Sequence, residues 1–212
     1  MADVIDITKL DQKKIDKICQ TLDKGQIIAY PTDTIYGLGV NAMDTEAATK
    51  LFQAKRRSKE NPVSILFPSI GELKQYFPNL NSFQQKCVER LLPGAVTLIL
   101  PLSPRTQFPA YFQKEGYTGV RIIEHPSLNK ILDKYKVPIS TTSVNPHNQP
   151  PAQNIDEIKS YFEEELSLIL KDKRPKQSKP STIIKLADTS YKLLREGSIP
   201  ARKIERTISE LK

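Results

Sequence analysis

The sequence predicts an α/β protein built on a mixed sheet. Strand-like segments rich in β-branched residues alternate along the chain with segments in which apolar residues recur at helical spacing. Three strand-like segments near the C-terminal end, over 166–170, 181–186 and 190–196, follow one another with no helix between them. That succession indicates a mixed sheet rather than an all-parallel one.

The elements of the first half are marked by their end signals. A helix is expected to begin after Asp11, a favoured N-cap residue, and to end at Gly25. The next elements are a strand over 26–30, a helix capped by Asp44 or Thr45, a strand over 63–67 and a helix over 82–92 closed by Pro93-Gly94.

The second half continues the alternation. We expect strands over 95–100, 119–123 and 138–144, and helices over 126–135, 154–166 and 201–212. Pro126 suits the first turn of its helix, where its missing N–H costs nothing. The lysine-rich stretch 171–181 is expected to form a solvated loop, or alternatively to close over an anionic ligand.

Composition bounds the protein class. The chain has 212 residues, 38% hydrophobic and 26% charged, which is typical of a water-soluble globular protein of one large or two small domains. It has no cationic, apolar leader and no apolar run long enough to span a bilayer, so we expect a cytoplasmic protein with no membrane partner. Cys19 and Cys87 lack metal-ligand spacing and are expected to be core thiols.

The net charge of +8 favours anionic partners such as phosphates, nucleotides or RNA. Several familiar sites are nevertheless absent from the sequence: no glycine-rich phosphate loop, no GxGxxG, no HExxH and no GxSxG. A nucleotide site in this chain must therefore be built from dispersed side chains and backbone.

The stretch PTDTIYG, residues 31–37, places oxygen-bearing side chains directly after a strand. Pro31 ends the strand ladder, and Thr32, Asp33 and Thr34 then follow at a strand end, where ligands often bind in open α/β sheets. Gly37, like Gly39 after it, allows a close backbone approach. The alternative is an ordinary turn with capped hydroxyls.

A second stretch, KRRSKENPVS over 55–64, offers cations. Lys55 and Arg57 suit a clamp for phosphate and carbonate, because Arg presents a planar fork and Lys a point charge. The alternative is a charge cluster that stabilises a helix C-terminus.

Two further stretches are weaker. STTSVNPHNQP over 140–150 is a hydroxyl-rich strand end, in which Ser143 and Asn145 are candidates for hydrogen bonds to phosphate or ribose, or form a simple turn. The stretches KPSTII and LLREGSIP add Ser181, Thr182 and Arg195.

Taken together, the order PTDTxYGL, KxR, PGxVTLIL, GVR, TSxN, PSTII and LLREG resembles the YrdC-like family, from about residue 10 to about residue 200. The resemblance implies a single YrdC-like domain over 1–212, with a twisted mixed sheet and a large basic cavity. It also implies L-threonylcarbamoyladenylate synthase activity, a nucleotidyl transfer that converts L-threonine, bicarbonate and ATP, with Mg²⁺, into threonylcarbamoyl-AMP and pyrophosphate. Partner proteins of a threonylcarbamoyl-transfer complex would then modify an adenosine beside the tRNA anticodon.

The resemblance also assigns residues. Thr32, Thr34 and Tyr36 would hold threonine and bicarbonate, and Lys55 and Arg57 would act in catalysis and on the nucleotide. The nucleotide wall would comprise Ser143, Asn145, Ser181, Thr182, Arg195 and, as a weaker match, Arg121. Asp33 would be structural, or would orient the amine or Mg²⁺; the resemblance names no other metal ligand.

This chain departs from the family pattern after Ser143. Val144 stands where alanine is common, and His147-Asn148 stands where Ser-Gly is expected. Asn tolerates left-handed backbone, so Asn148 is expected to keep the turn. Two other functions stay open: a relative without synthase activity that is regulatory or binds tRNA or double-stranded RNA, and carbamoyl transfer in another pathway, which usually needs a fused domain.

Overall fold

The computed structural model describes residues 2–104, 106–173 and 179–211. The strands within them are β1 (Asp3–Asp6), β2 (Ile27–Tyr30), β3 (Gly37–Gly39), β4 (Ser64–Leu66), β5 (Val96–Pro101), β6 (Tyr117–Arg121), β7 (Ile139–Ser143), β8 (Leu166–Lys171), β9 (Thr182–Leu186) and β10 (Tyr191–Arg195). The helices are α1 (Gln12–Asp23), α2 (Thr45–Ala54), α3 (Ile70–Tyr76), α4 (Ser82–Leu91), α5 (Pro126–Tyr135), α6 (Ile155–Phe162) and α7 (Ala201–Ser209), with short 3-10 turns η1 (Ile7–Lys9) and η2 (Ala110–Phe112).

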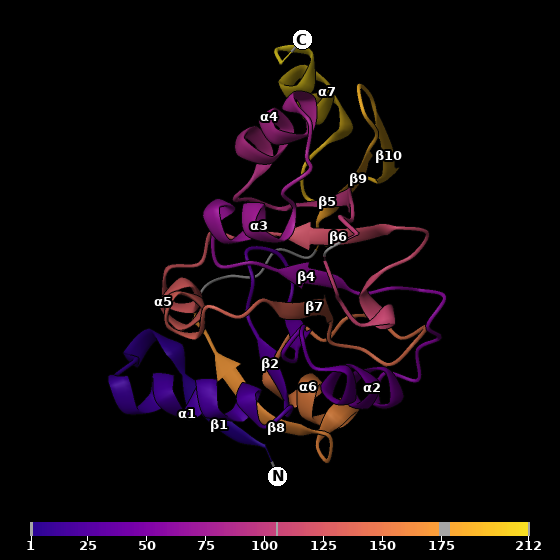
Figure 1. Cartoon of the computed structure of the whole chain (residues 1–212). Helices are drawn as coiled ribbons and strands as arrows, with labels where there is room; N and C mark the ends of the chain where they lie inside the picture. The colour runs from indigo at the N-terminus through magenta and orange to yellow at the C-terminus, as the bar shows by residue number, and fades with distance from the viewer. Residues whose placement is uncertain (1, 105, 174–178, 212) are drawn as a thin grey trace.

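The strands form one sheet in the order β1-β8-β2-β3-β7-β4-β6-β5-β9-β10 (Figure 1). Its neighbours are parallel at β1–β8, β8–β2, β4–β6 and β5–β9, and antiparallel at the other junctions. The predicted α/β class and the mixed character of the sheet are therefore confirmed.

Each face of the sheet is covered by its own cluster of apolar side chains. Helices α1 and α5 pack together over one face, in a cluster that includes Ile18, Leu132 and Ile139. Helices α2, α3, α4, α6 and α7 contribute to a larger cluster on the other face. Figure 1 shows α1 and α5 on one side of the molecule and α4 with α7 at the C-terminal end.

Side-chain caps set the helix starts. Asp11 accepts from the backbone N–H of Lys14, as predicted, and Asp44 rather than Thr45 caps α2. Asn81 and Gln84 form a reciprocal capping box at α4. These bonds satisfy backbone donors that the first turn of a helix leaves without partners.

Three short elements were not predicted: β1, β3 and α3. Each has seven residues or fewer, too few to show a period above the local composition. The helix predicted over 154–166 ends at Phe162, and the tail helix ends at Ser209. Of the loop predicted over 171–181, residues 174–178 lie outside the described residues, and Lys171 still belongs to β8.

Both cysteines are free thiols on helices, Cys87 fully buried and Cys19 half-buried, in agreement with the prediction. Across the described part of the chain, each helix is too short or too polar to cross a bilayer.

The glycines of β3 make room for an aromatic ring. A Cβ at Gly39 would lie 2.6 Å from Cε1 of Tyr30 and 3.0 Å from the carbonyl oxygen of Ser140. The Tyr30 hydroxyl donates to the same carbonyl at 2.8 Å, so the ring is fixed in place. The close approach that we predicted at this glycine is made to a buried tyrosine.

We expect Gly39→Ala to lower the free energy of unfolding by roughly 1–3 kcal/mol, because the ring must move off its hydrogen bond. Urea denaturation measures the change. Gly71→Ala is the matched control, since the nearest atom to its new Cβ lies 3.7 Å away. Equal losses in the two variants would contradict the packing argument.

Candidate active site

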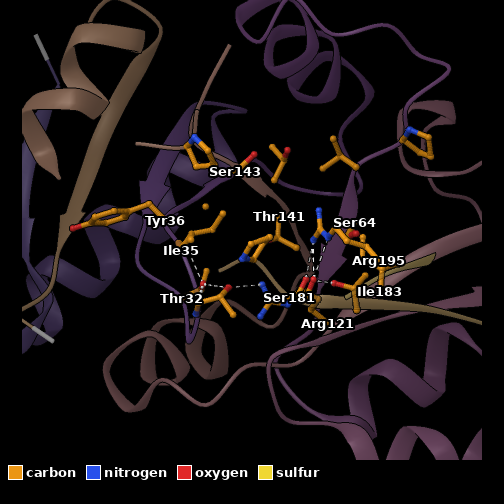
Figure 2. A pocket seen from close by; sticks show the side chains of 18 of the residues that line it. Thr32, Ile35, Tyr36, Ser64, Arg121, Thr141, Ser143, Ser181, Ile183 and Arg195 are labelled. Carbon is orange, nitrogen blue, oxygen red and sulfur yellow. Dashed lines mark hydrogen bonds between the residues drawn. The ribbon is translucent and has the colours of Figure 1, made fainter. Parts of the chain in front are cut away.

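A cavity of about 230 Å³ lies on the sheet face that carries α1 and α5. Strand side chains alternate between faces, so Thr141 and Ser143 of β7 share the face of Ile139, which packs against those helices. Eight of the eleven predicted site residues line the cavity (Figure 2): Thr32, Thr34, Tyr36, Arg57, Arg121, Ser143, Ser181 and Arg195. Three arginines line it, Arg57, Arg121 and Arg195.

The threonine turn after β2 is ordered by its own hydroxyls. The Thr32 hydroxyl donates to the carbonyl of Ile35 at 2.6 Å and accepts from the backbone N–H of Thr34 at 3.0 Å. The hydroxyls of Thr32 and Thr34 lie 3.0 Å apart. Because the Thr32 proton is used on Ile35, the Thr34 hydroxyl donates to Thr32, and both side chains are held in one orientation at one side of the cavity.

A buried ion pair fastens this turn to β6. Arg121 donates from Nη2 to Oδ1 of Asp33 at 2.5 Å and from Nη1 to the Thr34 hydroxyl at 3.4 Å. The two side chains are only 7% and 12% exposed. Burial raises the pKa of the Asp33 carboxyl, and the guanidinium of Arg121 opposes that rise. Of the roles expected for Asp33, the structure supports the structural one.

Tyr36 does not direct its phenol into the cavity. Its side chain is 1% exposed and belongs to the larger apolar cluster. Figure 2 shows the ring pointing away from the other labelled side chains. We therefore correct the prediction that the phenol holds substrate: this residue borders the cavity while its ring packs in the core.

Lys55 lies behind the cavity wall. Its Nζ donates to the carbonyl oxygens of Ser143 and Asn145, at 2.5 and 2.6 Å. Its own carbonyl accepts from the backbone N–H of His147 at 3.0 Å. This lysine, predicted to act directly on reactants, thus holds the loop after β7, and it is 2% exposed. Burial lowers its pKa, with a smaller effect from Arg57.

Arg57 lies in the cavity wall, as predicted. Its Nε donates to the carbonyl oxygen of Asn61 at 2.7 Å and its Nη2 to that of Pro62 at 3.3 Å. These bonds fix the guanidinium on neutral carbonyls, so its positive charge is retained.

The loop after β7 is held within itself. Ser143 donates to the Asn145 side-chain oxygen at 2.5 Å, and the Asn145 amide donates to the carbonyl of Gln149 at 2.6 Å. Ser143 lines the cavity, whereas the Asn145 side chain braces the loop. Asn148 has φ 66°, so it adopts the left-handed backbone that we predicted.

At the far side of the cavity, Arg195 of β10 donates to the carbonyl oxygen of Ser181 at 2.9 Å. The hydroxyls of Ser181 and Thr97 lie 2.7 Å apart, and both residues line the cavity. Figure 2 shows Ser181, Arg121 and Arg195 around the same space.

Thr182 has a different place from the one predicted. Its hydroxyl donates to the carbonyl of Ile199 at 2.6 Å and accepts from the backbone N–H groups of Gly197 and Ile199. A hydroxyl has one proton and two lone pairs, so this group is fully used. We therefore correct its assignment to the nucleotide wall: Thr182 holds the turn before α7.

Sequence reasoning missed Ser64, Thr97 and Thr141, which also line the cavity. For Thr97 the available signal was one polar residue within the apolar run of residues 95–100, since a strand turns successive side chains to opposite faces.

The arrangement is suited to binding anions. Arginines and hydroxyls line it, and no group of three or more His, Cys, Asp or Glu side chains that could hold a metal ion occurs among the described residues. Such a lining can position phosphate and carboxylate groups and neutralise their charge.

Comparison with known proteins agrees with the resemblance drawn from the motifs. The family model for Sua5, YciO and YrdC, described as telomere recombination, matches residues 20–197. A Methanocaldococcus jannaschii protein that is provisionally named threonylcarbamoyl-AMP synthase is 32% identical to this chain. The similarity covers 96% of this chain and 97% of the relative's length. A Bacillus subtilis protein named threonylcarbamoyl-AMP synthase is 27% identical over 99% of this chain, which spans 60% of that relative's length.

Solved structures share the fold. Sua5 from P. abyssi, in a structure described as complexed with L-threonine, superposes with a TM-score of 0.89 at 27% identity, over 99% of this chain and 61% of its own. E. coli YciO superposes with a TM-score of 0.84 over 96% of this chain and 100% of its own, and at 23% identity it supports the fold alone.

We expect Asp33→Asn to lower the free energy of unfolding by about 3 kcal/mol, because Arg121 is left buried without its counter-charge. Chemical denaturation measures the loss. Asp3→Asn is the matched control: Asp3 pairs with Lys17 at an exposed site, and its loss should leave stability nearly unchanged. Similar losses of unfolding free energy in the two variants would show that the buried ion pair contributes no more to stability than the exposed one.

Titration of Lys55 gives a second prediction. Burial lowers its pKa from 10.5 to about 7, so the unfolded chain binds more protons between these pH values. The contribution of Lys55 to the free energy of unfolding should therefore rise as the pH increases from about 7 to about 10.5. Denaturation of wild type and Lys55→Met across this range measures the difference; a flat difference would contradict the lowered pKa.

Proposed function

This chain belongs to the Sua5/YciO/YrdC family, and we propose that it is a nucleotidyltransferase that makes threonylcarbamoyl-AMP and pyrophosphate from L-threonine, bicarbonate and ATP. The proposal is supported by the M. jannaschii relative, which this chain matches over nearly its whole length, and by the P. abyssi Sua5 structure with L-threonine. Both likenesses extend across the segments that form the cavity.

One structural observation carries the proposal. A single cavity has the Thr32–Thr34 turn with Arg121 at one side and Ser181 with Arg195 at the other. We assign the first side to threonine, because adjacent hydroxyls and a guanidinium suit a hydroxy amino acid. The second side suits the nucleotide. Arg121 moves in this assignment from the predicted nucleotide wall to the threonine side.

The proposed chemistry needs positioning and charge neutralisation. The threonine amine adds to the carbon of bicarbonate, a hydroxyl leaves as water, and one carbamate oxygen then attacks the α-phosphorus of ATP. Holding the reactants together supplies as much as about 7–11 kcal/mol. Arg57, Arg121 and Arg195 lie in the wall, where fixed donors facing developing charge contribute roughly 3–4 kcal/mol each.

We propose that Mg²⁺ arrives with ATP, bound mainly through phosphate oxygens and water, and neutralises charge on the leaving pyrophosphate. The donor set agrees with this: the described residues form no carboxylate cage, and one oxygen of Asp33 already accepts from Arg121. The protein residues then act on the carbamate and on the nucleotide.

The product would be used by a second protein. Threonylcarbamoyl-AMP is a mixed anhydride and therefore an activated acyl donor, and we propose that a transfer complex carries its acyl group to an adenosine of tRNA. We propose that this role lies in tRNA modification in the cytoplasm, as the resemblance in the motifs implies; the relatives' names support the product itself.

The decisive test is threonine-dependent pyrophosphate release from ATP and bicarbonate, with mass detection of threonylcarbamoyl-AMP. Thr34→Val keeps the side-chain shape and removes the hydroxyl, so kcat/KM for threonine should fall about ten- to a hundredfold while KM for ATP stays near the wild-type value. Arg195→Met should raise KM for ATP instead. Arg206→Met, on the exposed face of α7, is the control. A folded protein that forms no threonine-dependent product would overturn the proposal in favour of a non-enzymatic, RNA-binding relative.

A further inference from the structure

A second buried acid contacts the segment that carries Arg121. Strand β8 ends at Lys171, beside the start of α5 (Figure 1), and the next residue, Asp172, places its Oδ2 3.1 Å from Nε2 of His125. The side chains of His125 and Asp172 are only 1% and 6% exposed. Oδ1 of Asp172 accepts from the backbone N–H of Lys173 at 2.7 Å, which orients the carboxylate. Neither His125 nor Asp172 lines the cavity.

Capping of α5 does not by itself require a histidine. His125 Nδ1 accepts from the backbone N–H of Leu128 at 3.2 Å and so caps the helix. Serine, threonine, aspartate and asparagine are the favoured residues at this position. Because Nδ1 accepts, the proton of the neutral ring is on Nε2, which lies toward Asp172. The imidazole therefore caps the helix and contacts the acid at the same time.

The two buried acids follow neighbouring strands and contact one short segment. Strands β2 and β8 are parallel neighbours, and Asp33 and Asp172 lie just beyond their ends. We call residues 121–125 the β6–α5 segment. It begins with Arg121, which donates to Asp33, and it ends with His125, which lies against Asp172. The segment is thus fastened at both of its ends to the carboxyl ends of two adjacent strands.

Between these contacts the segment is packed on both sides. Ile122 belongs to the larger apolar cluster, and Ile123 belongs to the cluster of α1 and α5. The carbonyl of Ile122 also accepts from the backbone N–H of Gly94 at 2.9 Å. Close-packed interiors have low compressibility and transmit strain. The position of His125 therefore bears on the position of Arg121.

We propose that His125 and Asp172 are positioning residues for the threonine side of the cavity. Their contact holds the β6–α5 segment in the place from which Arg121 reaches the Thr34 hydroxyl; the assignment of that side to threonine rests on the proposed function. Arg121 lies 3.4 Å from this hydroxyl but 2.5 Å from Asp33. Because 3.4 Å is near the upper limit of a hydrogen bond, a small shift of the segment breaks the contact with Thr34 first.

Binding of L-threonine and of ATP to the full chain, measured separately by calorimetry, gives the first test. His125→Asn keeps a favoured N-cap residue but is too short to reach Asp172, and Asp172→Asn removes the charge. In each variant the Kd for threonine should rise about five- to tenfold, the usual effect of one lost hydrogen bond. The Kd for ATP should stay near the wild-type value. The double variant should bind threonine as weakly as either single variant, because both changes remove the same contact.

Ser69→Ala is the matched control for a loss of stability. It removes the hydroxyl that caps α3, on the opposite face of the sheet, by accepting from the backbone N–H of Glu72. This variant should have a lower denaturation midpoint and wild-type Kd values for both ligands. Weaker threonine binding in the control too, or unchanged threonine binding in a folded His125→Asn variant, overturns the proposal.

A second measurement needs no ligand. Urea denaturation of Asp33→Asn, His125→Asn and the variant with both changes gives a double-mutant cycle of unfolding free energies. If the β6–α5 segment joins the two contacts, the loss in the double variant should be clearly smaller than the sum of the single losses; additive losses overturn the proposal. A wild type that binds no threonine refutes the proposed function, and the cycle still decides whether the segment couples the two acids.

Discussion

The ion pair between Arg121 and Asp33 is the interaction on which the geometry of the candidate active site depends. In sheet order, β3, β7 and β4 separate β2 from β6, and the pair joins the turn after β2 to the end of β6 across that distance. Both side chains are nearly buried, so each charge relies on the other. The same guanidinium reaches the Thr34 hydroxyl, so the pair sets the place of the threonine turn relative to the sheet.

Among the described residues, the other two arginines of the cavity wall donate to backbone carbonyls rather than to carboxylates. Arg57 donates to carbonyls of its own loop, and Arg195 donates to the carbonyl of Ser181. A carbonyl fixes the position of a cation and leaves its net charge intact, whereas a carboxylate would neutralise it. The wall is thus both rigid and positive, which is the arrangement that stabilises charge developing in a transition state.

The sequence predicted the α/β class, most elements and eight of the nineteen residues that line the cavity, because periodicity, caps and polar residues at strand ends are local signals. It did not predict that Lys55 and Thr182 hold backbone segments in place. Each bonds to backbone that is distant in sequence or hidden within a turn, so the residue type alone does not separate holding a loop from touching a ligand. The ring of Tyr36 packs in the larger apolar cluster, and the residue type alone does not say whether a phenol faces the core or the cavity.

The departures from the family pattern fall where backbone can absorb them. Val144 is fully buried in the larger apolar cluster, on the face away from the cavity, so its extra bulk lies in the core and not against a ligand. Asn148 takes the left-handed conformation that a glycine would take. His147 is held by its backbone N–H on the carbonyl of Lys55, a bond that any non-proline residue can make. The backbone of this loop is therefore held by its hydrogen bonds with Lys55, which do not depend on the side chains at 144, 147 and 148. Ser143 keeps its place in the cavity wall.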